Sequence, residues 1–133
     1  MRLQRFQDLT LTLAAKDPNA GQPTSLKDAG DSKHPFGLAV TLAGRPARIQ
    51  FTVKSAPSDN YDKPEQPVEG DPAPLDGPRA EGPEGWLAGL LAASGNREIA
   101  GIEQWSLRED PKDRRDGLTV QFHSGAEVYA RVL

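Results

Sequence analysis

The chain has 133 residues, 36% of them hydrophobic, with a formal net charge of −3 and no cysteine. This length provides one hydrophobic core but not two, so we expect a single domain over residues 1–133. The lack of cysteine excludes disulfides, thiolate nucleophiles and cysteine-ligated metals. No segment approaches the roughly 18 apolar residues of a membrane-spanning helix, so we expect a soluble protein with no membrane partner.

The N-terminal segment alternates leucine with threonine. Leu9, Leu11 and Leu13 are separated by Thr10 and Thr12, which is the period of a half-buried strand. We therefore predict a strand at this end of the chain.

The segment from Ala14 to Pro35 is rich in Asp, Gly, Pro and Ser and predicts a long loop. It contains His34, which could in principle act with Asp28 or Asp31 in acid–base or metal chemistry. Scattered Asp and one His are ordinary in loops, so we interpret His34 as a solvated residue and expect no metal site.

Two alternating segments, "FGLAVTL" and "ARIQFTVK", then predict a hairpin with its apolar residues on one face. Beside a two-residue turn, Pro46 would have no N–H to give to the sheet. We therefore expect a four-residue loop from Ala43 to Pro46, with Leu42 opposite Ala47.

The next segment is acidic and rich in proline. From Pro57 to Gly85 the chain has seven of its 12 prolines and eight acidic residues against two basic ones. Such composition does not build a core, and loops longer than about 15 residues in compact domains are commonly functional. We predict a long loop over residues 56–83, the acidic arm, between the third strand and the helix and ordered by a partner. The predicted partner-binding residues are Asp59, Tyr61, Asp62, Glu65, Glu69, Asp71 and Leu75.

The segment "GPEGWLAGLLAASGN" predicts the one helix, with Pro83 at its first position and Gly95 at its end. A strand is expected after it, from Ile99 to Leu107 and irregular near Gly101. The apolar stripe that would pack the helix on the sheet consists of Trp86, Leu87, Leu90 and Leu91.

A second hairpin is predicted from "LTVQF" and "AEVYARVL". A three-residue loop, residues 123–125, keeps the apolar faces together by placing Phe122 opposite Ala126. That loop requires a positive φ at Gly125, and His123 within it is expected to be exposed.

Together these elements predict an α+β fold. We expect a mostly antiparallel sheet, or a small sandwich or barrel, of about six strands with one packed helix and two long loops. The core should join Trp86 and Leu90 of the helix to Phe51, Val120 and Phe122 of the sheet.

The sequence has no phosphate-binding, dinucleotide-binding, zinc-hydrolase or nucleophile-elbow motif. It also has no cluster of Lys and Arg, so we expect no nucleic-acid partner. We predict a non-enzymatic structural or protein-interaction subunit, without cofactor, whose long loops contact copies of itself or other subunits. The alternative is a small ligand-binding module or enzyme with a site under the 14–35 or 56–83 loop, using His34 or His123.

The predicted order of strands, long central loop, helix and strands resembles that of tube-forming proteins of phage tails and related injection machines. The resemblance covers topology and no residues. It implies a virion-like component whose loops order against adjacent subunits, located in the cytoplasm or in a particle assembled there.

Overall fold

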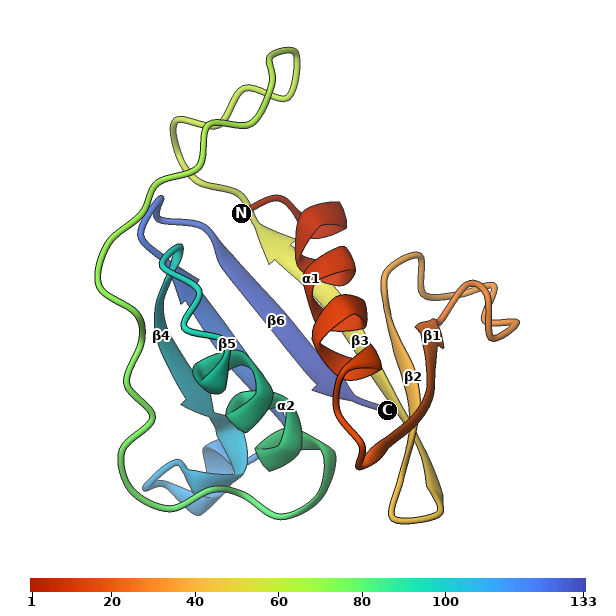
Figure 1. Ribbon diagram of the computed structural model, residues 1–133. Helices are drawn as coiled ribbons and strands as arrows, with labels where there is room; N and C mark the ends of the chain where they lie inside the picture. The colour runs from red at the N-terminus through yellow and green to blue at the C-terminus, as the bar shows by residue number, and fades with distance from the viewer.

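The computed structural model describes residues 1–133 and has six antiparallel strands in one open sheet, with two helices on one face (Figure 1). The sheet order is β1-β2-β3-β6-β5-β4, so the predicted α+β fold with about six antiparallel strands is confirmed. The elements are α1 (Leu3–Ala15), β1 (Ala20–Ser25), β2 (Gly37–Leu42), β3 (Arg45–Lys54), α2 (Gly82–Ala93), β4 (Ile99–Gln104), β5 (Gly117–Phe122) and β6 (Glu127–Val132), with short 3₁₀ turns at Trp105–Leu107 and Pro111–Asp113.

The chain repeats one arrangement of elements twice. The first half, α1-β1-β2-β3, and the second half, α2-β4-β5-β6, each have a helix followed by three strands. The halves meet at the centre of the sheet, where β3 pairs with β6 from Ile49↔Val132 to Lys54↔Glu127. The acidic arm connects the end of the first half to the start of the second.

A matching contact ties each helix to its sheet. Gln7 Oε1 in α1 accepts a hydrogen bond from the N–H of Gly37 at 2.9 Å, and Glu84 Oε1 in α2 accepts one from Gly117 at 2.8 Å. Any side chain on these glycines would overlap the next strand. A Cβ at Gly37 would lie 2.3 Å from the Ile49 carbonyl oxygen, and one at Gly117 would lie 2.4 Å from that of Ala130. Each glycine thus lets the start of β2 or β5 lie directly against its neighbour.

The predicted N-terminal strand is wrong, because this segment forms α1. Leu3, Phe6, Thr10 and Leu13 follow one another at spacings of three or four, the helical period. Phe6 and Thr10 are fully buried, and the Thr10 hydroxyl donates to the carbonyl of Gln7 at 2.9 Å. The element order therefore begins with a helix, and it differs at this point from the order on which the resemblance to tube-forming proteins depends.

The predicted loop from Ala14 to Pro35 contains β1, which pairs with β2 at the edge of the sheet. Its sequence, "AGQPTS", has no alternation of apolar and polar residues. The pairing also shifts between Gly21 and Thr24, where Gln22 has a φ of 49°. A bulged strand of this kind leaves no period-2 signal in the sequence.

The predicted four-residue loop of the first hairpin is also wrong. Ala43 and Gly44 form a two-residue turn with φ values of 50° and 76°, and Leu42 pairs with Arg45. Pro46 is the next residue of β3. The pairing of β3 with β6 begins only at Ile49, so an N–H at position 46 would have had no partner in β6. The apolar faces remain as predicted.

The second half follows the sequence predictions closely. The three-residue loop is confirmed by the hydrogen bond from Phe122 N to Ala126 O at 3.0 Å and by the φ of 92° at Gly125. The helix is confirmed as α2, and the β4–β5 register shifts just before Gly101 as expected. β4 ends at Gln104, three residues earlier than predicted, because the chain turns into a 3₁₀ helix.

Phe6 joins the two halves within the core. Its ring lies 5.0 Å from that of Phe51 in β3 and 6.1 Å from that of Phe122 in β5, the latter in an edge-to-face arrangement. Phe51, Phe122 and Val120 are buried as predicted.

Of the predicted apolar stripe of α2, Leu87 and Leu91 are buried, whereas Trp86 and Leu90 are only half-buried. The predicted full burial of these two residues is therefore wrong. Trp86 lies toward α1, and its indole N–H donates to Asp17 Oδ2 at 2.7 Å. This hydrogen bond lowers the pKa of Asp17.

Candidate functional site

The acidic arm is held against its own domain, first by Arg2. The Arg2 guanidinium donates to both carboxylate oxygens of Asp59, at 2.8 and 3.1 Å. It also donates to the carbonyls of Asn60 and Lys63, at 2.9 and 2.7 Å. The same group lies 4.6 Å from the centre of the Tyr61 ring. The hydrogen bond from Arg2 lowers the pKa of Asp59.

Arg5, one turn further along α1, binds two carboxylates from distant parts of the chain. It pairs with Glu65 in the arm and, at 2.7 Å, with Glu98 just before β4. The hydrogen bond to Glu98 is the main cause that raises the pKa of Arg5. One side chain therefore joins the first half, the second half and the arm.

Further along, the arm lies beside the ends of β4 and β5. The N–H of Gly70 donates to the Arg97 carbonyl at 2.8 Å. His123, which is exposed as predicted, has its Nε2 2.9 Å from the Asp71 carbonyl. Ala73 is buried in the core.

At the other end of β4, Gln104 holds the last part of the arm. Its side chain donates to the Pro78 carbonyl at 3.2 Å and accepts from the N–H of Ala80 at 2.8 Å. The arm thus runs along the outer side of β4 (Figure 1). The inference that a partner is needed to order the arm is wrong, because contacts within the chain hold it along its length.

Of the predicted partner-binding residues, Asp59 and Glu65 face their own domain. Tyr61 is 55% exposed, and its hydroxyl lies 2.8 Å from that of Ser55. Leu75 is half-buried. The structure therefore does not bring these seven residues together into one patch.

The remaining acidic side chains of the arm point to solvent. They are exposed and take part in none of the ion pairs of the protein. Asp76 and Glu81 among them were not predicted as partner-binding residues, although they belong to the same acidic segment. The five free carboxylates are those of Asp62, Glu69, Asp71, Asp76 and Glu81.

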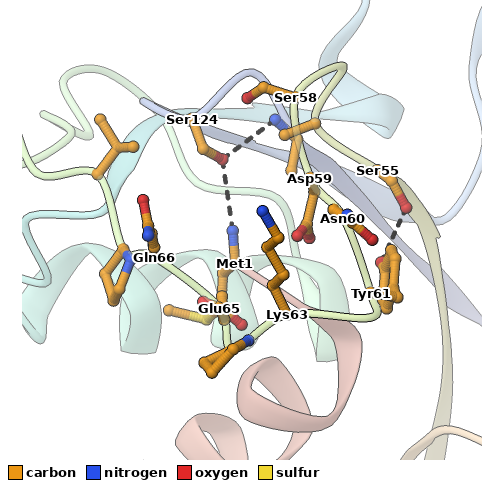
Figure 2. A pocket seen from close by; sticks show the side chains of 15 residues that line it. Met1, Ser55, Ser58, Asp59, Asn60, Tyr61, Lys63, Glu65, Gln66 and Ser124 are labelled. Carbon is orange, nitrogen blue, oxygen red and sulfur yellow. Dashed lines mark hydrogen bonds between the residues drawn. The ribbon is translucent and has the colours of Figure 1, made fainter.

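A cavity of about 400 Å³ lies between the first turn of the arm and the β5–β6 loop. Figure 2 shows its mainly polar lining, in which Ser124 faces Met1 and Tyr61 faces Ser55. Asp59 and Glu65 also line it. Asp59 is already paired with Arg2, and Glu65 with Arg5. The cavity therefore offers no free carboxylate for acid–base chemistry.

A second cavity, of about 590 Å³, lies between α1 and the β1–β2 connection and includes His34. Here His34 Nδ1 lies 2.7 Å from Asp31 Oδ2, while Asp31 Oδ1 accepts from the backbone N–H groups of Lys33 and His34. The His34 side chain is the main cause that lowers the pKa of Asp31 to about 2. His34 is thus half-buried and paired with Asp31, not solvated as predicted, and Asp28 is not its partner.

The largest hollow, of about 1070 Å³, is an open groove between the β2–β3 turn and the start of α2. Trp86, Leu42 and several prolines line it, and Arg45 is its one charged residue. It contains no acid, base or nucleophile that could carry out a reaction.

The face of the sheet away from the helices is open and polar. Because Ile49 and Phe51 in β3 point into the core, the alternate residues of that strand point to the other side. They include Arg48 and Lys54, which are exposed, and Arg131 in β6 lies diagonally from Arg48 on the same face. None of these three cations takes part in an ion pair.

No three His, Asp or Glu side chains converge to hold a metal ion. Neither helix has the length and apolar character required to cross a membrane. Comparison with protein families, curated proteins and solved structures finds no match for this chain.

Proposed function

We propose that the protein is a non-enzymatic assembly subunit that binds a basic protein surface through its acidic arm. The observation that supports this function is that some carboxylates of the arm are paired within the protein and the others are free at its surface. Asp59 and Glu65 fix the arm to α1, while five others are held at the surface without partners. An ordered loop loses little conformational freedom on binding, and unpaired charges of one sign speed association with an oppositely charged surface.

The partner that we propose is a second copy of the chain. The open sheet face of one molecule carries the unpaired cations Arg48, Lys54 and Arg131, whose charge complements that of the arm. Arg2 and Arg5 tie the arm to the helix-covered side, so the two surfaces point in different directions. A contact between two different surfaces of identical subunits builds rings or filaments, which includes the particle assembly expected from the sequence.

The test reverses charge on each surface separately. One variant carries Glu69→Lys with Asp76→Lys in the arm, and the other carries Arg48→Glu with Arg131→Glu on the sheet. Each variant alone should fail to self-associate in analytical ultracentrifugation, and a mixture of the two should associate again. Wild-type association should weaken as salt approaches 1 M, where the Debye length is about 3 Å.

The matched control is Glu109→Lys with Asp116→Lys, which changes the net charge equally at exposed sites outside the arm. It should associate as the wild type does at one fixed salt concentration. Unchanged association of the arm variant would refute the proposed function. If only the sheet variant were unaffected, the arm would keep its role and the receiving surface would lie elsewhere.

Charge reversal is a sharper test than deletion of the arm. Replacement of residues 58–81 by a short Gly/Ser connector should leave a folded monomer, because loop closure costs only about 0.6 kcal/mol per doubling of length. It would, however, also remove buried Ala73 and the arm partners of Arg2, Arg5 and Gln104. We therefore expect lower stability as well as lost association.

A further inference from the structure

The two matched helix contacts differ in one respect. In the second half, Glu84 uses both oxygens: Oε1 accepts from Gly117, and Oε2 accepts from the backbone N–H and the hydroxyl of Ser106. In the first half, Gln7 Oε1 accepts from Gly37. The Gln7 amide nitrogen has no hydrogen-bond partner in the protein. The first half thus leaves open the position that Ser106 fills in the second.

This unpartnered amide is buried yet reachable. Gln7 is only 8% exposed, and it lines the cavity of about 590 Å³ beside His34. No unpartnered side-chain nitrogen or oxygen is fully sealed inside the protein, so the Gln7 amide nitrogen is open to that cavity. Its orientation is fixed, because the N–H of Gly37 requires the oxygen and not the nitrogen as its partner.

The cavity holds other unused polar groups. Lys27 lines it and forms no ion pair. The Nδ1 of His34 lies 2.7 Å from the Asp31 carboxylate, and in the tautomer that carries its proton on Nδ1 the Nε2 is an acceptor without a partner in the protein. Asp31 also lines the cavity, but His34 and two backbone N–H groups already occupy its two oxygens. Phe36 supplies an apolar wall.

We propose that this cavity binds a small hydroxylated organic anion. Its carboxylate or phosphate group accepts hydrogen bonds from the Gln7 amide and the Lys27 ammonium, and its hydroxyl donates to His34 Nε2. The volume of about 590 Å³ lies within the usual range for small-molecule sites. This site does not involve the acidic arm, and it goes beyond the assembly function proposed above.

The test is an NMR titration of the full chain with four probes. Glycolate and glycerol 1-phosphate carry the hydroxyl, whereas acetate and methyl phosphate lack it. We expect saturable shifts of the Gln7 side-chain amide and the His34 ring, with tighter binding of the hydroxylated member of each pair. The carboxylate or phosphate pair with the greater affinity identifies the anionic group.

Gln7→Glu is the decisive variant, because it keeps an acceptor for Gly37, as Glu84 does for Gly117, but places a negative charge where the anion should bind. It should remain folded and weaken binding at least about tenfold, as should Lys27→Met. Lys112→Met, an exposed site far along the chain, is the control and should bind as the wild type does. His34→Ala should remove the preference for the hydroxylated probes.

Two results would overturn the proposal. One is the absence of saturable shifts with all four probes up to about 10 mM. The other is binding that Gln7→Glu leaves unchanged in a variant with a wild-type fold. Neither result bears on charge-dependent self-association, so the two proposals can fail separately.

Discussion

The two halves of the sheet share one layout but complete it differently. In the second half, Glu84 is fully bonded to Gly117 and Ser106, and the Trp105 indole N–H donates to Thr119 Oγ1 at 2.8 Å over the open face. In the first half, the corresponding amide of Gln7 faces a cavity. The comparison shows that the same arrangement of helix and strands can be closed by an internal polar network or can leave a polar group open to a cavity.

The largest effect should come from the residue that makes the halves interdependent. Phe6→Ala should cost about 3–5 kcal/mol, because it removes a fully buried ring that contacts both halves. Denaturant unfolding followed by fluorescence and circular dichroism should still give one transition, at lower denaturant. Two separate transitions would mean that the halves unfold independently, and near-wild-type stability would contradict the described core.

The equivalence of the halves can be tested at their matched glycines. Gly37→Ala and Gly117→Ala should each cost about 3 kcal/mol, since the new methyl group would overlap a carbonyl oxygen that cannot move freely. Gly21→Ala is the control, because its Cβ would be 3.4 Å from the nearest atom. Thermal melts that show a large loss for only one of the two matched variants would disprove their equivalence.

Because the two helix contacts differ, the exchange of a carboxylate and an amide at them should lower the free energy of unfolding by unequal amounts. Glu84→Gln should cost about 1–3 kcal/mol, because the NH₂ group that replaces Oε2 cannot accept the hydrogen bond from the N–H of Ser106. Gln7→Glu should cost less than about 1 kcal/mol, since only one hydrogen bond depends on an oxygen there. Urea unfolding of both variants gives the two values, and equal losses would count against the asymmetry.

The smallest expected effect is local to the cavity of the first half. NMR titration should find the pKa of Asp31 at about 2, and His34→Ala should move it toward the ordinary value of about 3.9. Because the folded-state pKa is lowered, this interaction stabilises the protein above about pH 4 and is lost as the pH falls through about 2. An ordinary Asp31 pKa in the wild type would show that the pair with His34 does not form in solution.

Much of the fold was predictable where the sequence pattern had one meaning. β2, β3, β5 and β6 alternate strictly, and only a three-residue loop at 123–125 keeps the apolar faces of β5 and β6 together. α1 was not recognised because Leu9, Leu11 and Leu13 also alternate, although Phe6 and Thr10 lie at helical spacing. β1 was not recognised because a bulge and a proline remove its period.

A repeat in the sequence carried information about the halves that was not used. "GLAV" at residues 37–40 and "GLTV" at 117–120 occupy matching positions at the start of β2 and β5. This repeat would have predicted two copies of one arrangement, and so a helix before β1.

The site was less predictable than the fold. Arg2 and Arg5 bind carboxylates about 60 and 90 residues away in the chain, and such pairs leave no local pattern in the sequence. A single Gln in a helix likewise gives no sign that its amide lacks a partner.

The route of the acidic arm also affects how the sheet avoids joining other sheets. An outermost strand has unpaired backbone groups that another chain can extend into an aggregate. β1 is protected by its bulge and by Pro23, whereas β4 is more regular after Gly101. The arm passes along the outer side of β4 and is fastened at Arg97 and Gln104 (Figure 1). A protease cut within the arm should therefore expose the backbone groups of this strand to pairing with a strand of another chain.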